Sequence, residues 1–127
     1  MTFALWTILV AAMLPYVTVG AAKFGAGYDN ASPRLWTERL QGWRRRAEWA
    51  HRNHFEAFPA FAAGVLVSHV TGASHAWVDG FAGGFVVLRV GYTLAYVADR
   101  PTLRAVSWFL ALGCVIGLFW ASAAATG

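Results

Sequence analysis

Charged residues are scarce in this sequence of 127 residues. They make up 13% of the chain, whereas a typical soluble domain has about 25%. Hydrophobic residues account for 58% of the chain, and the mean hydropathy is +0.49. This balance excludes an ordinary soluble domain and predicts a membrane protein. A chain of this length is expected to form one domain, over residues 1–127.

Cysteine is almost absent as well. Cys114 is the single cysteine, so no intrachain disulfide and no CxxC metal site can form. His51 and His54 are three residues apart and lack the HExxH spacing of a zinc-binding helix, so we expect no metal. We expect all four histidines to be solvated or interfacial, and Cys114 to be a small buried apolar residue.

Long uncharged runs set the predicted architecture, because a membrane-spanning helix needs about 20 predominantly apolar residues. Four such helices are expected at about 2–22, 44–70, 76–98 and 105–126. The first and the last carry no charge, and the third carries only Asp79 and Arg89. Asp79 should lie in a first helical turn, where a carboxylate suits the helix dipole. The sequence therefore predicts an all-α fold, an integral membrane four-helix bundle.

Basic residues concentrate in two connections. The stretch from Lys23 to Arg52 holds seven Lys and Arg residues, and the last connection holds Arg100 and Arg104. The positive-inside rule places both connections in the cytoplasm and both termini outside. The run Arg44–Arg46 is most simply a lipid headgroup anchor. We expect a multi-pass protein of a bacterial inner membrane, with membrane lipids but no nucleic acid as partners.

The first connection also contains turn signals and a possible short helix. Ser32 and Pro33 form a cap and a first-turn proline for a helix over Arg34–Trp43. The second long helix then begins with a polar half. Arg52, Asn53 and Glu56 share one face of it, at the point where the chain becomes apolar.

Arg89 is the most informative single residue. An arginine deep in a spanning helix costs about 2.5–3.5 kcal/mol on insertion scales, so it needs a partner or a wet cavity. Glu56 is a possible partner. Two readings stay open, a pair that only holds the bundle together and a pair that belongs to a site. Tyr92 and Tyr96 follow Arg89 on the same helix face.

Together these groups predict a basic pocket lined with aromatic residues at the cytoplasmic membrane face. Arginine binds carboxylates bidentately, glutamate accepts an ammonium, and tyrosine makes a directed hydrogen bond. A ligand with two carboxylates, one ammonium and a thiol would match, and glutathione is such a ligand. An arginine near the thiol would favour the nucleophilic thiolate. The predicted pocket residues are Arg52, Asn53, Glu56, Tyr92, Tyr96 and Arg104.

Two motifs resemble a known family. Ala-His-Arg-Asn at 50–53, followed by Glu56 and Pro59, resembles the second-helix signature of the MAPEG family, membrane-associated proteins in eicosanoid and glutathione metabolism. Arg89-Val90, Tyr96 and Arg104 resemble that family's third helix and the start of its fourth. The resemblance covers most of the chain from Tyr28 onward.

The resemblance implies a homotrimer with glutathione sites between neighbouring subunits. It implies that Arg104 stabilises the thiolate as the catalytic residue. Three positions depart from the family pattern: Trp49 stands where glutathione-using members usually have arginine, Tyr92 replaces a histidine, and Ala105 replaces a serine. The expected glutathione-binding residues are Arg52, Asn53, Glu56, Arg89, Tyr92 and Tyr96.

The expected function is that of a glutathione-dependent membrane transferase or peroxidase, acting on a lipophilic electrophile that enters from the bilayer. The alternative is a non-catalytic membrane protein that binds a lipid or a small anionic metabolite. Arg104 and Tyr96 favour the enzyme, whereas Trp49 favours the alternative.

Overall fold

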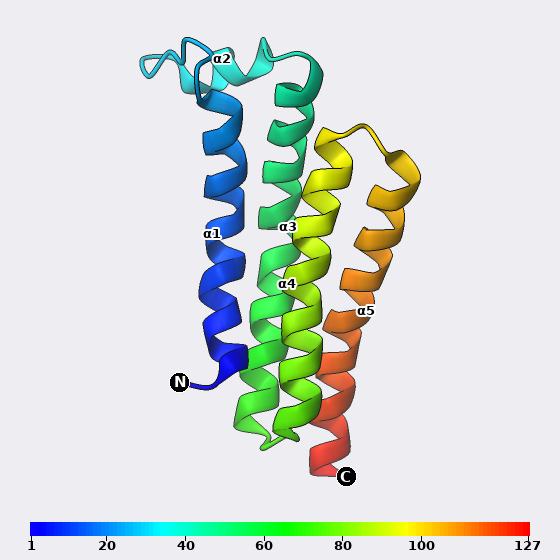
Figure 1. Ribbon diagram of the computed structural model, residues 1–127. Coiled ribbons are helices and arrows are strands. Elements are labelled where there is room, and N and C mark those ends of the chain that lie inside the picture. Colours follow the sequence, from blue (N-terminus) through cyan, green and yellow to red (C-terminus); the bar gives the residue numbers. More distant parts are fainter.

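The computed structural model describes all 127 residues and contains helices but no strand (Figure 1). The all-α prediction is confirmed, but there are five helices instead of four, because the short helix of the first connection is formed. It ends at Glu38, not at Trp43. The helices are α1 (Phe3–Lys23), α2 (Pro33–Glu38), α3 (Gly42–Val70), α4 (His75–Val97) and α5 (Pro101–Thr126).

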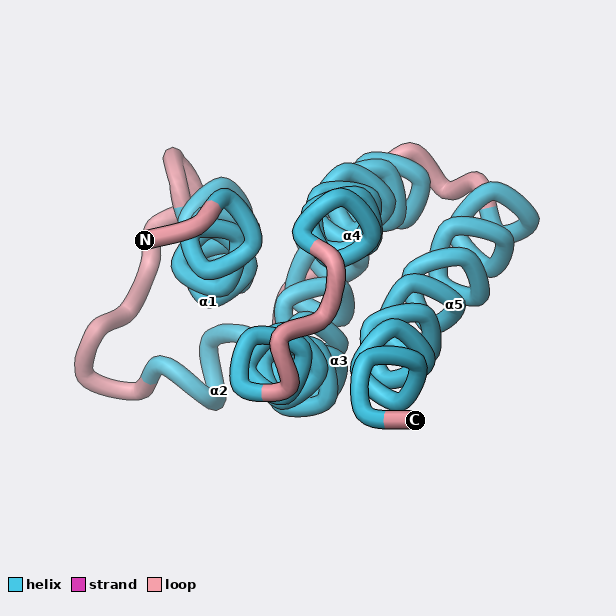
Figure 2. The backbone as a smooth tube through the Cα atoms, turned by 90° about the horizontal axis from the view of Figure 1, so that it is seen from below, coloured by secondary structure: helices cyan, strands magenta, loops and turns pink.

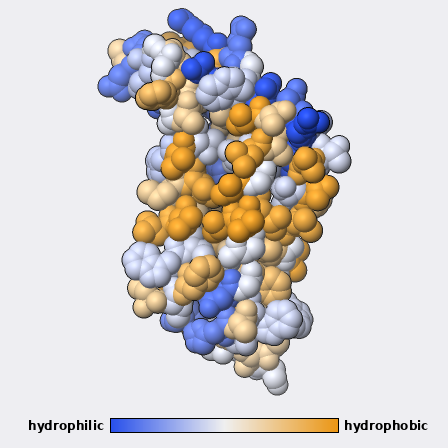
Figure 3. Space-filling model, viewed as in Figure 1, coloured by the Kyte–Doolittle hydropathy of each residue, from blue (hydrophilic) through white to orange (hydrophobic).

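Three helices, α1, α4 and α5, are long and apolar enough to cross a membrane. α3 is longer than any of them, with 29 residues, but its first half is charged. Many apolar side chains of the long helices are exposed. In Figure 3 they gather across the middle of the molecule, whereas hydrophilic side chains crowd the end that carries α2. The helices thus have the surface of an integral membrane protein.

α3 lies at the centre of the bundle and packs against all four other helices. α1 packs mainly on α3, and α4 mainly on α5, as the end view in Figure 2 shows. The core between α3 and α4 includes a stacked pair, Phe61 on Phe85, with 3.9 Å between ring centroids. Both chain termini lie at one end of the bundle, and both basic connections lie at the other (Figure 1).

The two tight connections end their helices in the same way but with different residues. After α3, Gly72 has a φ of +69°, and the Ala73 amide donates to the Ser68 carbonyl at 3.0 Å. After α4, Asp99 has a φ of +57°, and the Arg100 amide donates to the Ala95 carbonyl at 2.8 Å. Both are Schellman-type ends, in which glycine is the usual left-handed residue. Asp99 therefore holds a strained position.

Two helix starts differ from the predicted ones, and each moves a charged residue. α5 begins at Pro101, not at Ala105, since proline is tolerated in a first turn. Arg104 therefore lies one turn inside α5. α4 begins at His75, so Asp79 is not in its first turn. Asp79 instead accepts a hydrogen bond from the Ala4 amide, 3.0 Å away, and complements the dipole of α1.

The arginine run predicted as a headgroup anchor has a second role in the structure. Arg44 donates to the Ala22 and Phe24 carbonyls at the end of α1, at 3.1 Å each. Arg45 donates to the carbonyl of Glu38, the last residue of α2. Arg46 donates to the carbonyl of Val97, the last residue of α4, at 3.1 and 3.2 Å. Three consecutive cations thus satisfy carbonyls at three helix ends, where the helix dipole favours positive charge.

Candidate functional site

A groove along α3, α4 and α5 brings most of the predicted site residues together. Its part between α3 and α4 has a volume of about 440 Å³, and its part toward α5 has about 300 Å³. Asn53, Tyr92 and Tyr96 line both parts, so we call it the tyrosine groove. Its lining consists of Trp49, Arg52, Asn53, Glu56, Tyr92, Tyr96, Arg104, Ala105, Trp108 and Phe109.

Cations and aromatic rings alternate from Arg104 in the groove to Arg89 behind it. The Arg104 guanidinium lies over the Tyr96 ring, 4.5 Å from its centroid. Tyr96 meets Tyr92 edge to face at 5.5 Å, and the Arg89 guanidinium lies over Tyr92 at 4.3 Å. Arg104 is half-buried and has no carboxylate within ion-pair distance. Its charge is therefore available to a ligand in the groove.

Arg89 does not pair with Glu56, so the partner that both open readings assumed is wrong. Its side chain is only 1% exposed, and it donates to Asn53 Oδ1 at 2.9 Å and contacts His54 Nδ1 at 3.2 Å. Asn53 Nδ2 in turn donates to Glu56 at 2.8 Å. Arg89 Nε has no hydrogen-bond partner. Arg89 thus lies behind the tyrosine groove, not in its lining, and Asn53 relays between it and Glu56.

The prediction that all four histidines are solvated or interfacial is wrong for His54. Its side chain is 3% exposed, and its Nε2 is 2.8 Å from the Thr93 hydroxyl. The buried side of α3 runs through Ala50, His54 and Phe61 at spacings of four and seven residues. This helical period was a usable signal for burial of His54.

Sequence reasoning also missed Glu48. Its side chain is 4% exposed, and its carboxylate accepts a hydrogen bond from Arg52 Nε at 2.5 Å. The i to i+4 spacing of Glu48 and Arg52 on one helix is the signal that could have revealed the pair. Arg52 itself is largely exposed at the edge of the groove. One of the two groove cations is therefore already compensated within the chain.

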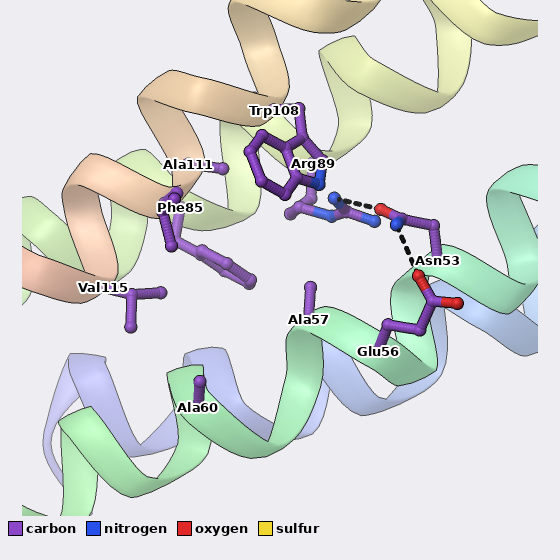
Figure 4. A pocket seen from close by; sticks show the side chains of 10 residues that line it. Asn53, Glu56, Ala57, Ala60, Phe85, Arg89, Trp108, Ala111 and Val115 are labelled. Carbon is purple, nitrogen blue, oxygen red and sulfur yellow. Dashed lines mark hydrogen bonds between the residues drawn. The ribbon is translucent and has the colours of Figure 1, made fainter.

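A smaller, mostly apolar pocket adjoins the groove. It has a volume of about 180 Å³ and shares Asn53, Glu56 and Trp108 with the groove. Figure 4 shows the polar groups of Asn53, Glu56 and Arg89 at one end and apolar side chains at the other. The full lining is Asn53, Glu56, Ala57, Ala60, Phe85, Arg89, Trp108, Ala111, Leu112 and Val115. The groove carries the charged side chains and the adjoining pocket is mostly apolar, so the two spaces suit a polar and an apolar ligand side by side.

The fold and the groove define a class of helical integral membrane proteins with a basic, tyrosine-lined site at one end of the bundle. A family model covers nearly the whole chain and narrows this class. The MAPEG family model matches residues 3–124, and the chain belongs to that family. No curated protein and no solved structure matches the chain.

The donor set of the groove fits glutathione in part. Arg104 is a cation without an anion, which suits a thiolate, and Glu56 is an exposed carboxylate, which suits an ammonium. The Tyr92 and Tyr96 rings border the same space. The fit is weakest at the ligand's carboxylates, because Arg52 is held by Glu48 and position 49 is a tryptophan.

Proposed function

We propose that this protein is a glutathione-dependent membrane transferase or peroxidase that acts on lipophilic electrophiles. The observation that carries this proposal is the Arg104 guanidinium over Tyr96, which forms no ion pair, in a groove that also contains the exposed Glu56 carboxylate. Membership of the MAPEG family, which includes glutathione transferases, supports it. The proposed substrates are electrophiles that dissolve in the bilayer, as expected from the sequence.

The chain's own residues have separable tasks in this proposal. Glutathione, when bound, supplies the thiol that attacks the electrophile. Arg104 and the positive end of α5 stabilise negative charge on sulfur, which favours thiolate over thiol. Glu56 accepts the ligand's ammonium group, and Tyr96 orients the ligand next to Arg104. Arg52 and Asn53 complete the polar edge of the groove.

The lipophilic substrate has an apolar route to the groove. Trp108 lines both the tyrosine groove and the apolar pocket, so one indole ring borders the two spaces. Phe109, which lines the groove, and Leu112, which lines the pocket, are also on α5, and both are exposed. We propose that the electrophile approaches along α5 from the hydrocarbon region and meets the sulfur near Arg104.

Glutathione titration by calorimetry on detergent-purified protein is the direct test. A transferase assay with a generic aromatic electrophile and a peroxidase assay with a lipid hydroperoxide should follow. We expect saturable glutathione binding and turnover in one of the two assays. Binding without turnover in either would favour a non-catalytic protein, and no binding would refute the proposal.

We further propose that the assembly is a homotrimer and that the end with the basic connections faces the cytoplasm. The seven basic residues from Lys23 to Arg52 support the orientation. Native mass spectrometry in mild detergent should show mainly trimer, and mainly monomer or dimer would contradict this. A reporter that is active only in the cytoplasm should stay inactive when it is fused after Gly127.

A non-catalytic membrane protein that binds a lipid or a small anionic metabolite is the second candidate. The pairing of Arg52 with Glu48 and the tryptophan at position 49 favour it, because both reduce the positive charge available to glutathione's carboxylates. The two candidates differ in turnover: Arg104→Ala should lower the turnover of a transferase or peroxidase, whereas a non-catalytic protein has no turnover to lower.

A further inference from the structure

We propose that the apolar pocket beside the tyrosine groove is a second small-molecule site, which binds an uncharged apolar molecule that carries one hydroxyl group. Such a site goes beyond the proposed function, because it needs neither a thiol nor Arg104. The residues that line it come from α3, α4 and α5 of one chain, so it is formed without a neighbouring subunit.

The size and the walls of the pocket describe the body of the ligand. Its volume is about 180 Å³, and an engineered apolar cavity of about 150 Å³ binds benzene. Seven of the ten lining residues are hydrophobic. Phe85, Ala111 and Val115 lie at the end away from Asn53 and Glu56 (Figure 4). One aromatic ring with a short substituent therefore fits, and removal of its apolar surface from water favours binding.

The polar end of the pocket has two hydrogen-bonding positions that the chain itself does not use. Arg89 is buried, and its Nη1 and Nη2 atoms contact Asn53 and His54, but its Nε has no hydrogen-bond partner. Glu56 accepts a hydrogen bond from Asn53 through Oε2, whereas its Oε1 accepts none within the chain. An unpaired buried donor is unfavourable, so a ligand oxygen that reached Arg89 Nε would relieve a cost already present in the fold.

These two positions select the head group of the ligand. A carboxylate would face the Glu56 carboxylate, and an ammonium would face the Arg89 guanidinium. Either charged group would also lose its hydration in a mostly apolar pocket, which costs far more than desolvation of a hydroxyl. A hydroxyl can accept from Arg89 and donate to Glu56 at the same time, whereas a carbonyl can only accept. The pocket therefore favours an alcohol.

Trp108 lines the pocket and can report its occupation, because bromine quenches the fluorescence of an indole that it contacts. The probes are 4-bromobenzyl alcohol and 4-bromotoluene, added to detergent-purified protein. The chain has seven tryptophans, so the contribution of Trp108 is taken as the difference from Trp108→Phe. The alcohol should half-quench Trp108 at about tenfold lower concentration, the size of one hydrogen bond to a charged group. Partition into detergent alone would favour 4-bromotoluene.

Two alanines of α3 provide a matched pair of variants. The Ala60 side chain points into the pocket (Figure 4), so Ala60→Leu should fill the space and abolish quenching of Trp108 by the alcohol. Ala63 is also exposed on α3 but lines neither the pocket nor the groove. Ala63→Leu should leave the quenching unchanged, which controls for added bulk on the helix.

A charged probe tests the selection of the head group. In the unchanged protein, 4-bromobenzoate should quench Trp108 at least tenfold more weakly than the alcohol does. Glu56→Gln removes the like charge from the polar end while the cation of Arg89 remains. This variant should therefore admit 4-bromobenzoate and bring its quenching to within about threefold of that of the alcohol.

Each of three results would refute the alcohol site. The first is quenching by 4-bromotoluene at the same or a lower concentration than the alcohol, and the second is stronger quenching by 4-bromobenzoate in the unchanged protein. The third is undiminished quenching by the alcohol in folded Ala60→Leu. If that variant does not fold, the comparison of the three probes on the unchanged protein still decides. Glutathione is absent from all these measurements, so their failure would leave the proposed function standing, and the converse also holds.

Discussion

Arg89 on α4 donates a hydrogen bond to the side-chain oxygen of Asn53 on α3, 2.9 Å away, and no carboxylate contacts its guanidinium. The buried cation is therefore held by a neutral amide. The same amide donates to Glu56 at 2.8 Å, so the negative charge lies one hydrogen bond away. This relay leaves the Glu56 carboxylate free of an ion pair and exposed to the groove.

The relay makes Asn53 more important for stability than Glu56. Asn53→Ala should lower the free energy of unfolding by about 1.5–3 kcal/mol, because it removes a bond to a buried charged group. Glu56→Ala keeps the bond between Arg89 and Asn53 and should cost less. Thermal unfolding in detergent, followed by circular dichroism, measures both. Equal losses would mean that Glu56 contributes as much as Asn53 to holding Arg89, which would contradict this ranking.

Arg104 should affect turnover more than binding. Arg104→Ala should lower the turnover rate about 100- to 1,000-fold, the effect of removing one preorganised electrostatic group. Glutathione affinity should change much less, because Glu56 and Tyr96 still hold the ligand. Steady-state kinetics, combined with the ultraviolet absorbance of the bound thiolate, separates the two effects. Unchanged turnover in a folded variant would remove Arg104 from the catalytic role, whereas partial rescue by Arg104→Lys would support it.

Arg46 should stabilise the bundle through its bonds to the end of α4. Arg46→Ala leaves the Val97 carbonyl without this charged donor, so it should lower the free energy of unfolding by about 1.5–3 kcal/mol. Arg39→Ala is a matched control, because it removes the same charge from an exposed side chain in the connection just before α3. A similar loss of thermal stability in both variants would show that total charge, and not the bond to α4, is responsible.

The strained residue before α5 predicts a stabilising substitution. Asp99 has a φ of +57°, where glycine has no steric penalty. Asp99→Gly should therefore raise the free energy of unfolding by about 0.5–1 kcal/mol, and Asp99→Ala should lower it. The melting temperatures of the two variants in the same detergent should move in opposite directions. Movement in the same direction would contradict a role for backbone strain.

Much of this fold was readable from the sequence because the membrane imposes length and polarity on each helix. The uncharged runs at 2–22 and 105–126 predicted α1 and α5, and the family motifs predicted the MAPEG membership that the family model confirms. The ends of the helices were harder to predict from the sequence. Pro101 reads as a turn residue, yet it begins α5, because a first-turn proline loses no helical hydrogen bond.

The site was predicted in its composition but not in its pairings. Spacing on one helix shows which side chains share a face, and it placed Arg52, Asn53 and Glu56 together. It does not show which of several acceptors on α3 a cation on α4 will reach. Arg89 met Asn53 and His54 because the close packing of α3 on α4 brings those two to the same depth.

The three arginines from 44 to 46 gain their hydrogen-bond acceptors at different times during synthesis of the chain. Arg44 and Arg45 find their carbonyls on α1 and α2, which have already left the ribosome when the run emerges. The carbonyl that Arg46 needs is on Val97, 51 residues later. A nascent chain that has inserted only α1 and α3 therefore presents one cation without its acceptor, until α4 is complete and packs on α3.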